Sequence, residues 1–184
     1  MRVLVTHASK HGATADIARA IGAVLTQHGL ETAVLPVAET RALALYDAVV
    51  LGSAVYMGRW LDEAKAFIES NEEWLAGLPV WLFTSGPIGE PLSPADEPIE
   101  SRELAIQLNA RDRRSFAGRL DPRKLGFLER TAIHFVHAPE GDYLDWQAVR
   151  DWATTIATQL LASKAEPGRP SAIGPAAATG PGRK

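Results

Sequence analysis

The sequence predicts an α/β fold in which helices cover both faces of a doubly wound, five-stranded parallel sheet. Short runs of β-branched and aromatic residues alternate with longer segments whose apolar residues recur every three or four positions. In addition, three of the segments that follow expected strands are rich in glycine, serine, threonine or proline. Such loops are typical of the carboxyl edge of a parallel sheet, where ligands bind.

The elements follow one another as strand and helix along the chain. The expected strands are short apolar runs bounded by turn residues, at 2–6, 32–35, 48–52, 79–84 and 115–118. The helical spacing of apolar residues predicts helices at 14–25, 61–74 and 145–160, with a short helical turn at 42–45. His28-Gly29 is a typical helix stop. The segment 48–52 is nearly all apolar, which indicates a strand buried on both faces.

Composition limits the chemistry that the chain can perform. The chain has 184 residues, 46% of them hydrophobic, which suits one domain with a real core. It contains no cysteine, which excludes disulfides, thiolate metal sites and redox thiols, so any redox chemistry requires a bound cofactor. Neither a signal-peptide pattern nor an apolar run of membrane-spanning length is present. We therefore expect a cytoplasmic protein.

Charge and composition divide the chain into two parts. Residues 1–162 form the expected domain, and 163–184 form a Pro/Gly/Ala-rich tail that we expect to be disordered. The formal net charge is −3, and the tail alone carries +3, which leaves −6 on the domain. An acidic domain argues against nucleic acid as the main partner.

The first loop, Thr6–Thr14, joins the first strand to the first helix. Its residues Ser9-Lys10-His11-Gly12-Ala13-Thr14 offer two hydroxyls and a run of backbone N–H groups at a helix start, which suits one phosphate group. The loop has neither the Gly-Lys-[Ser/Thr] of a Walker A motif nor the pattern Gly-x-Gly-x-x-Gly. A terminal monophosphate therefore fits better than a pyrophosphate. The alternative is an ordinary turn in which Ser9 or Thr14 only caps the helix.

The second and third loops suit a flat heteroaromatic ring. In Gly52–Trp60, Tyr56 and Trp60 offer aromatic faces, while the small residues Ser53, Ala54 and Gly58 leave room for the ring. The alternative is that Tyr56 and Trp60 only cover the core. In Thr84–Gly89, Ser85 and Gly86 offer polar groups to the far edge of a ring, although a plain Gly-Pro turn is the alternative.

These motifs resemble those of the flavodoxins. Ser9–Thr14 is similar to the flavodoxin phosphate loop Ser/Thr-x-Thr-Gly-x-Thr, with His11 in place of a threonine, and Val50–Gly58 resembles the flavodoxin loop beside the flavin ring. The resemblance covers about residues 2–160 and implies FMN as the cofactor. The implied FMN-binding residues are Ser9, Lys10, His11, Gly12, Ala13, Thr14, Ser53, Ala54, Val55, Tyr56, Gly58, Ser85 and Gly86.

Within this family, the sequence is most similar to the branch that includes the menaquinone-dependent protoporphyrinogen dehydrogenases. Three segments carry the similarity: 116–120, 122–136 and 143–146. The branch has an insertion that corresponds here to 121–140, which we expect to meet a quinone, a membrane surface or a partner protein. The alternative is that this segment packs on the sheet edge. Its His134 and His137 have no carboxylate or cysteine to complete a metal site, so no metal is expected.

The resemblance implies an FMN-dependent oxidoreductase that oxidises protoporphyrinogen IX with a quinone as acceptor. Two other functions stay open. One is a flavodoxin-type electron carrier that docks on redox partner proteins, and the other is a non-catalytic module that has lost FMN, because His11 departs from the motif. Arg59 favours the enzyme, since a fixed cation near a reduced flavin stabilises its negative charge, unless Arg59 is only a solvated surface residue.

Overall fold

The computed structural model describes residues 1–86, 98–117, 119–120, 141–142 and 144–165 of the chain. Five strands form a parallel sheet in the order β2-β1-β3-β5-β6, and the short strand β4 pairs antiparallel with β3. The bounds are β1 Arg2–Ala8, β2 Glu31–Pro36, β3 Ala48–Tyr56, β4 Arg59–Trp60, β5 Val80–Ser85 and β6 Asp112–Phe116. The predicted doubly wound sheet is confirmed, and the strand order reverses between β1 and β3.

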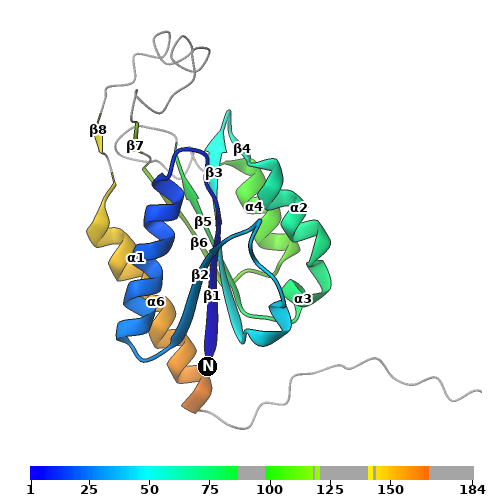
Figure 1. Ribbon diagram of the computed structural model, residues 1–184, viewed down its shortest axis with the longest axis vertical. Helices are drawn as coiled ribbons and strands as arrows, with labels where there is room; N and C mark the ends of the chain where they lie inside the picture. Colours follow the sequence, from blue (N-terminus) through cyan, green and yellow to red (C-terminus); the bar gives the residue numbers. More distant parts are fainter. Residues whose placement is uncertain (87–97, 118, 121–140, 143, 166–184) are drawn as a thin grey trace, which may run out of the picture.

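Helices cover both faces of this sheet (Figure 1). Helices α1 (Ala13–Gln27) and α6 (Trp146–Ala165) lie on one face. On the other lie α2 (Asp62–Ser70), α3 (Glu72–Ala76) and α4 (Ile99–Gln107), while the 3-10 turn η1 (Leu43–Leu45) leads into β3. The α1 face of the sheet buries Val3, Val5 and Phe83, and the α2 face buries Leu4, Leu51 and Leu82. Alternate strand residues thus serve two separate cores, which explains why the central strands are apolar throughout.

Several elements differ from their predicted bounds. Strand β1 continues to Ala8 and β3 continues to Tyr56, so residues expected in loops lie on strands. The helix expected at 61–74 is broken into α2 and α3 at Asn71, whose φ is −131°. The Asn71 side chain donates a hydrogen bond of 2.7 Å to the Phe67 carbonyl, which satisfies an acceptor at the end of α2.

Helix α4 was not predicted from the sequence. Its Ile99 and Ile106 are 72% and 81% exposed, whereas Ser101 is buried. The helix therefore lacks the apolar periodicity by which a buried face is recognised. Its buried contacts to the sheet come mainly from Leu104, Ala105 and the following Leu108.

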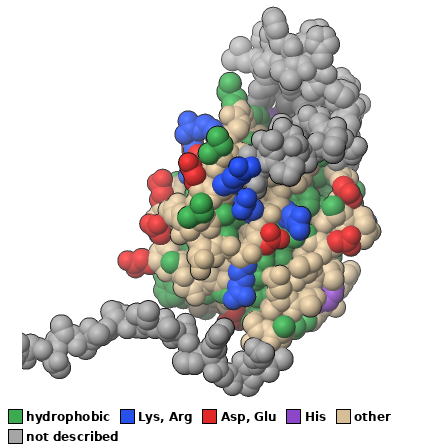
Figure 2. All heavy atoms as spheres, turned by 180° about the vertical axis from the view of Figure 1, so that it is seen from behind, with side chains coloured by type: hydrophobic (Ala, Val, Ile, Leu, Met, Phe, Trp, Pro, Cys, Tyr) green, Lys and Arg blue, Asp and Glu red, His purple; other side chains and the backbone are tan. Residues whose placement is uncertain are grey.

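Strand β6 begins at Asp112, three residues before the predicted start at 115. It is an edge strand, and both Arg113 and Arg114 on it are exposed. Figure 2 shows basic side chains along the middle of the face seen from behind, with acidic side chains both among them and to either side. Charged residues on an edge strand discourage pairing with another chain. Because of these residues, the strand also lacks the apolar run by which the other strands were predicted.

Two short strands, β7 (Arg119–Leu120) and β8 (Gly141–Asp142), pair antiparallel on either side of 121–140. The predicted insertion 121–140 itself lies outside the described residues. Helix α6 begins after Asp145, whose Oδ1 accepts the N–H groups of Gln147 and Ala148, and it ends at Ala165, five residues beyond its predicted end. The predicted tail lies outside the described residues from 166 onward.

Within the described ranges, no helix combines the length and the apolar composition that crossing a bilayer demands.

Candidate functional site

The three predicted loops meet at the carboxyl edge of the sheet (Figure 1). Thr14 Oγ1 and Ser85 Oγ share a hydrogen bond of 2.7 Å, which joins the first loop to the third. The His11 and Tyr56 rings pack edge to face, with their centres 6.0 Å apart, and Lys10 Nζ lies 5.0 Å from the centre of the Tyr56 ring. These contacts join the first loop to the second. The structure therefore brings residues that follow β1 together with residues at the ends of β3 and β5.

The first loop places its backbone N–H groups at the start of α1. Gly12 is the N-cap of this helix, with φ of +96°, and no side chain caps it. The first helical hydrogen bond runs from the Asp16 N–H to the Gly12 carbonyl, so the N–H groups of 13, 14 and 15 precede it. Ser9 Oγ accepts the Gly12 N–H at 3.1 Å. The positive end of the helix dipole and these N–H groups suit an anion.

Thr14 and Ser85 are almost completely buried, with 1% and 5% of their surfaces exposed. Their shared hydrogen bond satisfies two hydroxyls that would otherwise be costly to bury. Gly86 follows with φ of +95°, and a Cβ added there would lie 3.5 Å from the Val55 carbonyl oxygen. Ser85 and Gly86, in the described part of the third loop, thus lie directly against the first and the second loops. Beyond Gly86, residues 87–97 are outside the described part.

His7 lies on β1 just before the first loop. Its side chain is buried, and its Nδ1 has no hydrogen-bond partner among the described residues. Burial lowers the pKa of His7; the charge of Arg19 adds to this effect, and that of Glu39 opposes it. The imidazole is therefore held neutral near neutral pH.

The second loop is a β-hairpin rather than an irregular loop. Val55 pairs with Trp60 and Tyr56 pairs with Arg59, so Ser53, Ala54, Val55 and Tyr56 all lie on β3. The two residues between the strands, Met57 and Gly58, have φ of +50° and +76°. Positive φ at both central positions is typical of a two-residue hairpin turn. Met57 at the tip is completely exposed.

Two residues of this hairpin serve structure. Ser53 is buried; its hydroxyl donates to the Ala54 carbonyl and accepts the Leu61 N–H at 3.0 Å. Trp60 is 2% exposed, and its indole N–H bonds to Ser101 Oγ at 2.8 Å. Of the two interpretations of Trp60, the one in which it covers the core is confirmed. Tyr56, by contrast, is only half-buried and contacts the first loop.

Arg59 lies at the base of the hairpin beside the Glu100 carboxylate, which the sequence analysis did not identify. Its side chain is 73% exposed, and its Nε is 3.9 Å from Glu100 Oε1. Glu100 belongs to α4 and also contacts Lys65 Nζ at 3.4 Å. The positive charge of Arg59 therefore faces a negative charge, in addition to solvent. Because Glu100 is distant in sequence and lies on an unpredicted helix, no local motif could have shown this pair.

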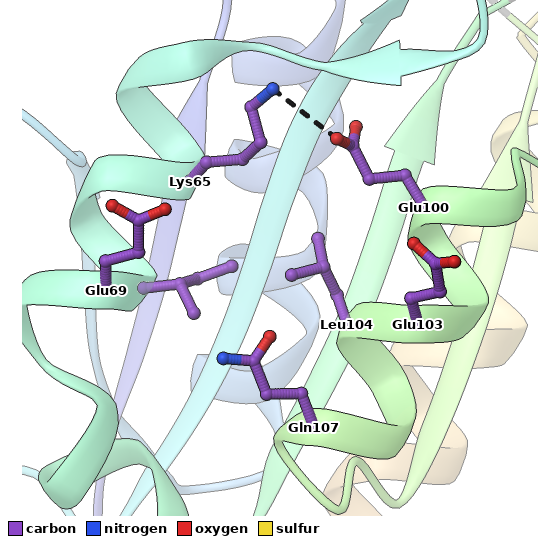
Figure 3. A pocket seen from close by; sticks show the side chains of 7 residues that line it. Lys65, Glu69, Glu100, Glu103, Leu104 and Gln107 are labelled. Atoms are coloured by element: carbon purple, nitrogen blue, oxygen red, sulfur yellow. Dashed lines mark hydrogen bonds and ion pairs between the residues drawn. The ribbon is translucent and has the colours of Figure 1, made fainter.

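A shallow hollow of about 210 Å³ lies between α2 and α4 (Figure 3). Its walls carry Ile68 and Leu104 together with Glu69, Glu103 and Gln107, and the Lys65–Glu100 pair lies at one end. The hollow shares no lining residue with the contacts among the three loops. Within the described part of the chain, no group of three or more His, Cys, Asp or Glu is placed to hold a metal ion.

These features define a doubly wound α/β protein with a loop site at the point where the strand order reverses. The chain belongs to the flavodoxin domain family, because the family model of that description matches residues 4–146. Flavodoxin family proteins bind FMN. A search of curated proteins by sequence found no match.

Solved structures share the fold at low sequence identity. A flavodoxin from the domain Archaea is 19% identical, with a TM-score of 0.60, and the alignment covers 88% of this chain and 99% of that one. Flavodoxin 2 from Bacillus cereus is 23% identical, with a TM-score of 0.58 and coverage of 86% and 99%. Rubredoxin oxygen:oxidoreductase from Desulfovibrio gigas is 14% identical, with a TM-score of 0.62, and the alignment covers 90% of this chain but 37% of that one.

Proposed function

We propose that this protein is an FMN-dependent oxidoreductase that oxidises protoporphyrinogen IX and passes the electrons to a quinone. The observation that carries the cofactor part is the meeting of a helix-start loop, an aromatic hairpin and a hydroxyl-bearing strand end at one edge of the sheet. FMN supplies the electron and hydride transfer, and the protein supplies binding, orientation and electrostatics.

The residues of the first loop fit the phosphate of FMN. Ser9 and Thr14 offer hydroxyls, the α1 start offers N–H groups, and Lys10 is the one Lys, Arg, Asp or Glu residue of the segment 9–14. Asp16, the first acidic residue after this segment in the sequence, forms an ion pair with Arg19. A donor set that holds no carboxylate suits a dianion. In this proposal His11 and the Ala13 N–H complete the cradle, and the Gly12 N–H, which donates to Ser9 Oγ, holds the loop in its shape.

The other two loops fit the flavin ring. Tyr56 is half-buried and offers an aromatic face, while the small residues Ala54 and Gly58 on the same hairpin would leave space beside it. Ser85 and Gly86 would face the opposite edge of the ring. Ser53 would support this surface without facing the ring, because its hydroxyl accepts the Leu61 N–H where the hairpin leads into α2.

The proposal of protoporphyrinogen IX as substrate and a quinone as acceptor rests on the sequence resemblance to the menaquinone-dependent branch. The antiparallel pair β7–β8 flanks 121–140, the segment that corresponds to the insertion of that branch. We propose that 121–140 meets the quinone at a membrane surface from the cytoplasmic side. These residues lie outside the described part, so the support comes from their sequence alone.

The test is an anaerobic assay with protoporphyrinogen IX, a menaquinone analogue and the FMN-loaded protein. We expect porphyrin fluorescence to appear only when the protein, FMN and the quinone are all present. Protein without FMN is the control for spontaneous oxidation. Porphyrin formation no faster than in this control would contradict the proposed enzyme.

One observation favours the second candidate, a flavodoxin-type electron carrier that docks on redox partner proteins. The acids Asp62, Glu63 and Glu100 lie in the first turns of α2 and α4 and outnumber the cations Lys65 and Arg59, with which Asp62 and Glu100 form ion pairs. An acidic rim suits docking on a basic partner. The variant Arg59→Glu separates the two functions. In an enzyme that uses the Arg59 charge, it should lower the midpoint potential of bound FMN and slow quinone reduction. In a carrier, the rate of quinone reduction should change little.

A further inference from the structure

The hairpin that carries Tyr56 is anchored to α4 by two hydrogen bonds of Trp60, in addition to the Arg59–Glu100 ion pair. The Trp60 backbone N–H donates to Glu100 Oε2 at 2.5 Å, and its indole N–H donates to Ser101 Oγ at 2.8 Å. Both acceptors belong to the first turn of α4. Since Trp60 pairs with Val55 across the hairpin, its position fixes the register of the whole β3–β4 turn.

The second carboxylate oxygen of Glu100 faces two cations. Oε1 lies 3.4 Å from Lys65 Nζ and 3.9 Å from Arg59 Nε, and Figure 3 shows the Lys65–Glu100 contact across the groove between α2 and α4. The side chains of Glu100 and Lys65 are only 20% and 19% exposed. A largely shielded carboxylate with three donors around it holds its place better than a solvated one.

We propose that Glu100 is a positioning residue for the flavin site: it holds the β3–β4 hairpin against α4 and offsets the charge of Arg59. This inference rests on the proposed FMN site, because Tyr56 on the hairpin is the residue that would face the ring. Glu100 does not touch the three-loop contacts itself. It acts through Trp60, whose place sets that of Tyr56, and through Arg59, whose guanidinium it faces.

The proposal divides the action of Glu100 into a hydrogen bond and a charge, and two variants separate them. Glu100→Gln keeps an oxygen that can accept the Trp60 N–H but removes the negative charge. Glu100→Ala removes both. Glu103→Gln is the matched control, because Glu103 lies on the same helix and lines the same groove without a hydrogen bond or ion pair to the hairpin among the described contacts.

The first measurement is hydrogen exchange of the Trp60 amide in the full chain without flavin. Loss of a hydrogen bond to a charged acceptor should speed this exchange by about tenfold or more in Glu100→Ala. Glu100→Gln should restore most of the protection, and Glu103→Gln should match the wild type. Equal exchange in Glu100→Ala and Glu103→Gln would overturn the proposal whether or not FMN binds, so this result is independent of the proposed function.

The second measurement is the affinity for FMN and for riboflavin. Because the hairpin faces the ring and not the phosphate, Glu100→Ala should weaken both ligands by the same factor, about tenfold. Glu100→Gln should keep both affinities within about twofold and raise the midpoint potential of bound FMN, since a negative charge near the hairpin is removed. A loss confined to FMN, or a potential that does not move, would contradict the proposal. If the wild type bound neither flavin, the proposed function would fail, and amide exchange alone would decide the role of Glu100.

Discussion

Gly52 lies on β3 directly before the ring hairpin, and we predict that Gly52→Ala destabilises the protein. In the register of the sheet, Gly52 pairs with His7 on one side and with Phe83 on the other. A Cβ at position 52 would lie 2.0 Å from Phe83 Cζ and 2.3 and 2.4 Å from the two Cε atoms. These distances are far inside van der Waals contact, so the Phe83 ring must move.

The surroundings of Phe83 set the size of the effect. The ring is fully buried, and its centre lies 6.4 Å from that of Phe116 and 6.3 Å from that of Trp152. Neither neighbour leaves open space, so the strain should resemble that of other overpacked cores, about 1–3 kcal/mol. For a chain of this size that loss corresponds to a fall in Tm of about 2–12 °C.

The assay is urea unfolding of Gly52→Ala followed by circular dichroism. Gly77→Ala is the control, since a Cβ there has its nearest contact at 3.5 Å and the residue has negative φ. We expect this control to stay within about 0.5 kcal/mol of the wild type. The double variant Gly52→Ala with Phe83→Leu should recover part of the loss relative to the sum of the single changes. A Gly52→Ala protein as stable as the wild type would refute the reasoning.

Three further predictions concern a buried histidine, the phosphate loop and the tail. Burial, with the charge of Arg19, lowers the pKa of His7, so stability should be greatest above the unfolded-state pKa and fall as pH drops towards the lower folded-state pKa. His7→Phe should remove this part of the pH dependence of unfolding between about pH 5 and pH 8. Thr14→Val should weaken FMN by about 1–3 kcal/mol in equilibrium dialysis but leave riboflavin nearly unchanged, and an equal loss for both would contradict it. A chain that ends at Ala165 should keep its Tm and FMN affinity, because from its Pro/Gly/Ala-rich composition we expect the remainder to bury too little surface to fold; a large loss of either would show that the tail docks.

The sheet and the meeting of its loops were predictable because apolar runs identify buried strands. Once β1, β3 and β5 are placed side by side and parallel, their carboxyl ends must lie at one edge. The Thr14–Ser85 hydrogen bond follows from this topology, although the two residues are far apart in sequence.

The hairpin and its anchor were not predictable by the same means. Two-residue turns with positive φ are usually signalled by Asn-Gly or Asp-Gly, and Met57-Gly58 lacks that signal. In helix α4, Ser101 is buried and accepts the Trp60 indole N–H, whereas Ile99 is exposed. The pattern of the helix is therefore not that of an amphipathic helix. The Glu100–Trp60 bond depends on both of these elements, and therefore only the folded chain reveals it.

The most direct test of the central claim is equilibrium dialysis of the full chain against FMN and riboflavin. A phosphate held by the α1 start should make FMN bind at least about tenfold more tightly than riboflavin, and raised salt should narrow the difference. The bound flavin should also give an absorption spectrum that differs from that of the free cofactor. Equal affinity for the two flavins, or binding of neither, would contradict the assignment of the three loops to FMN.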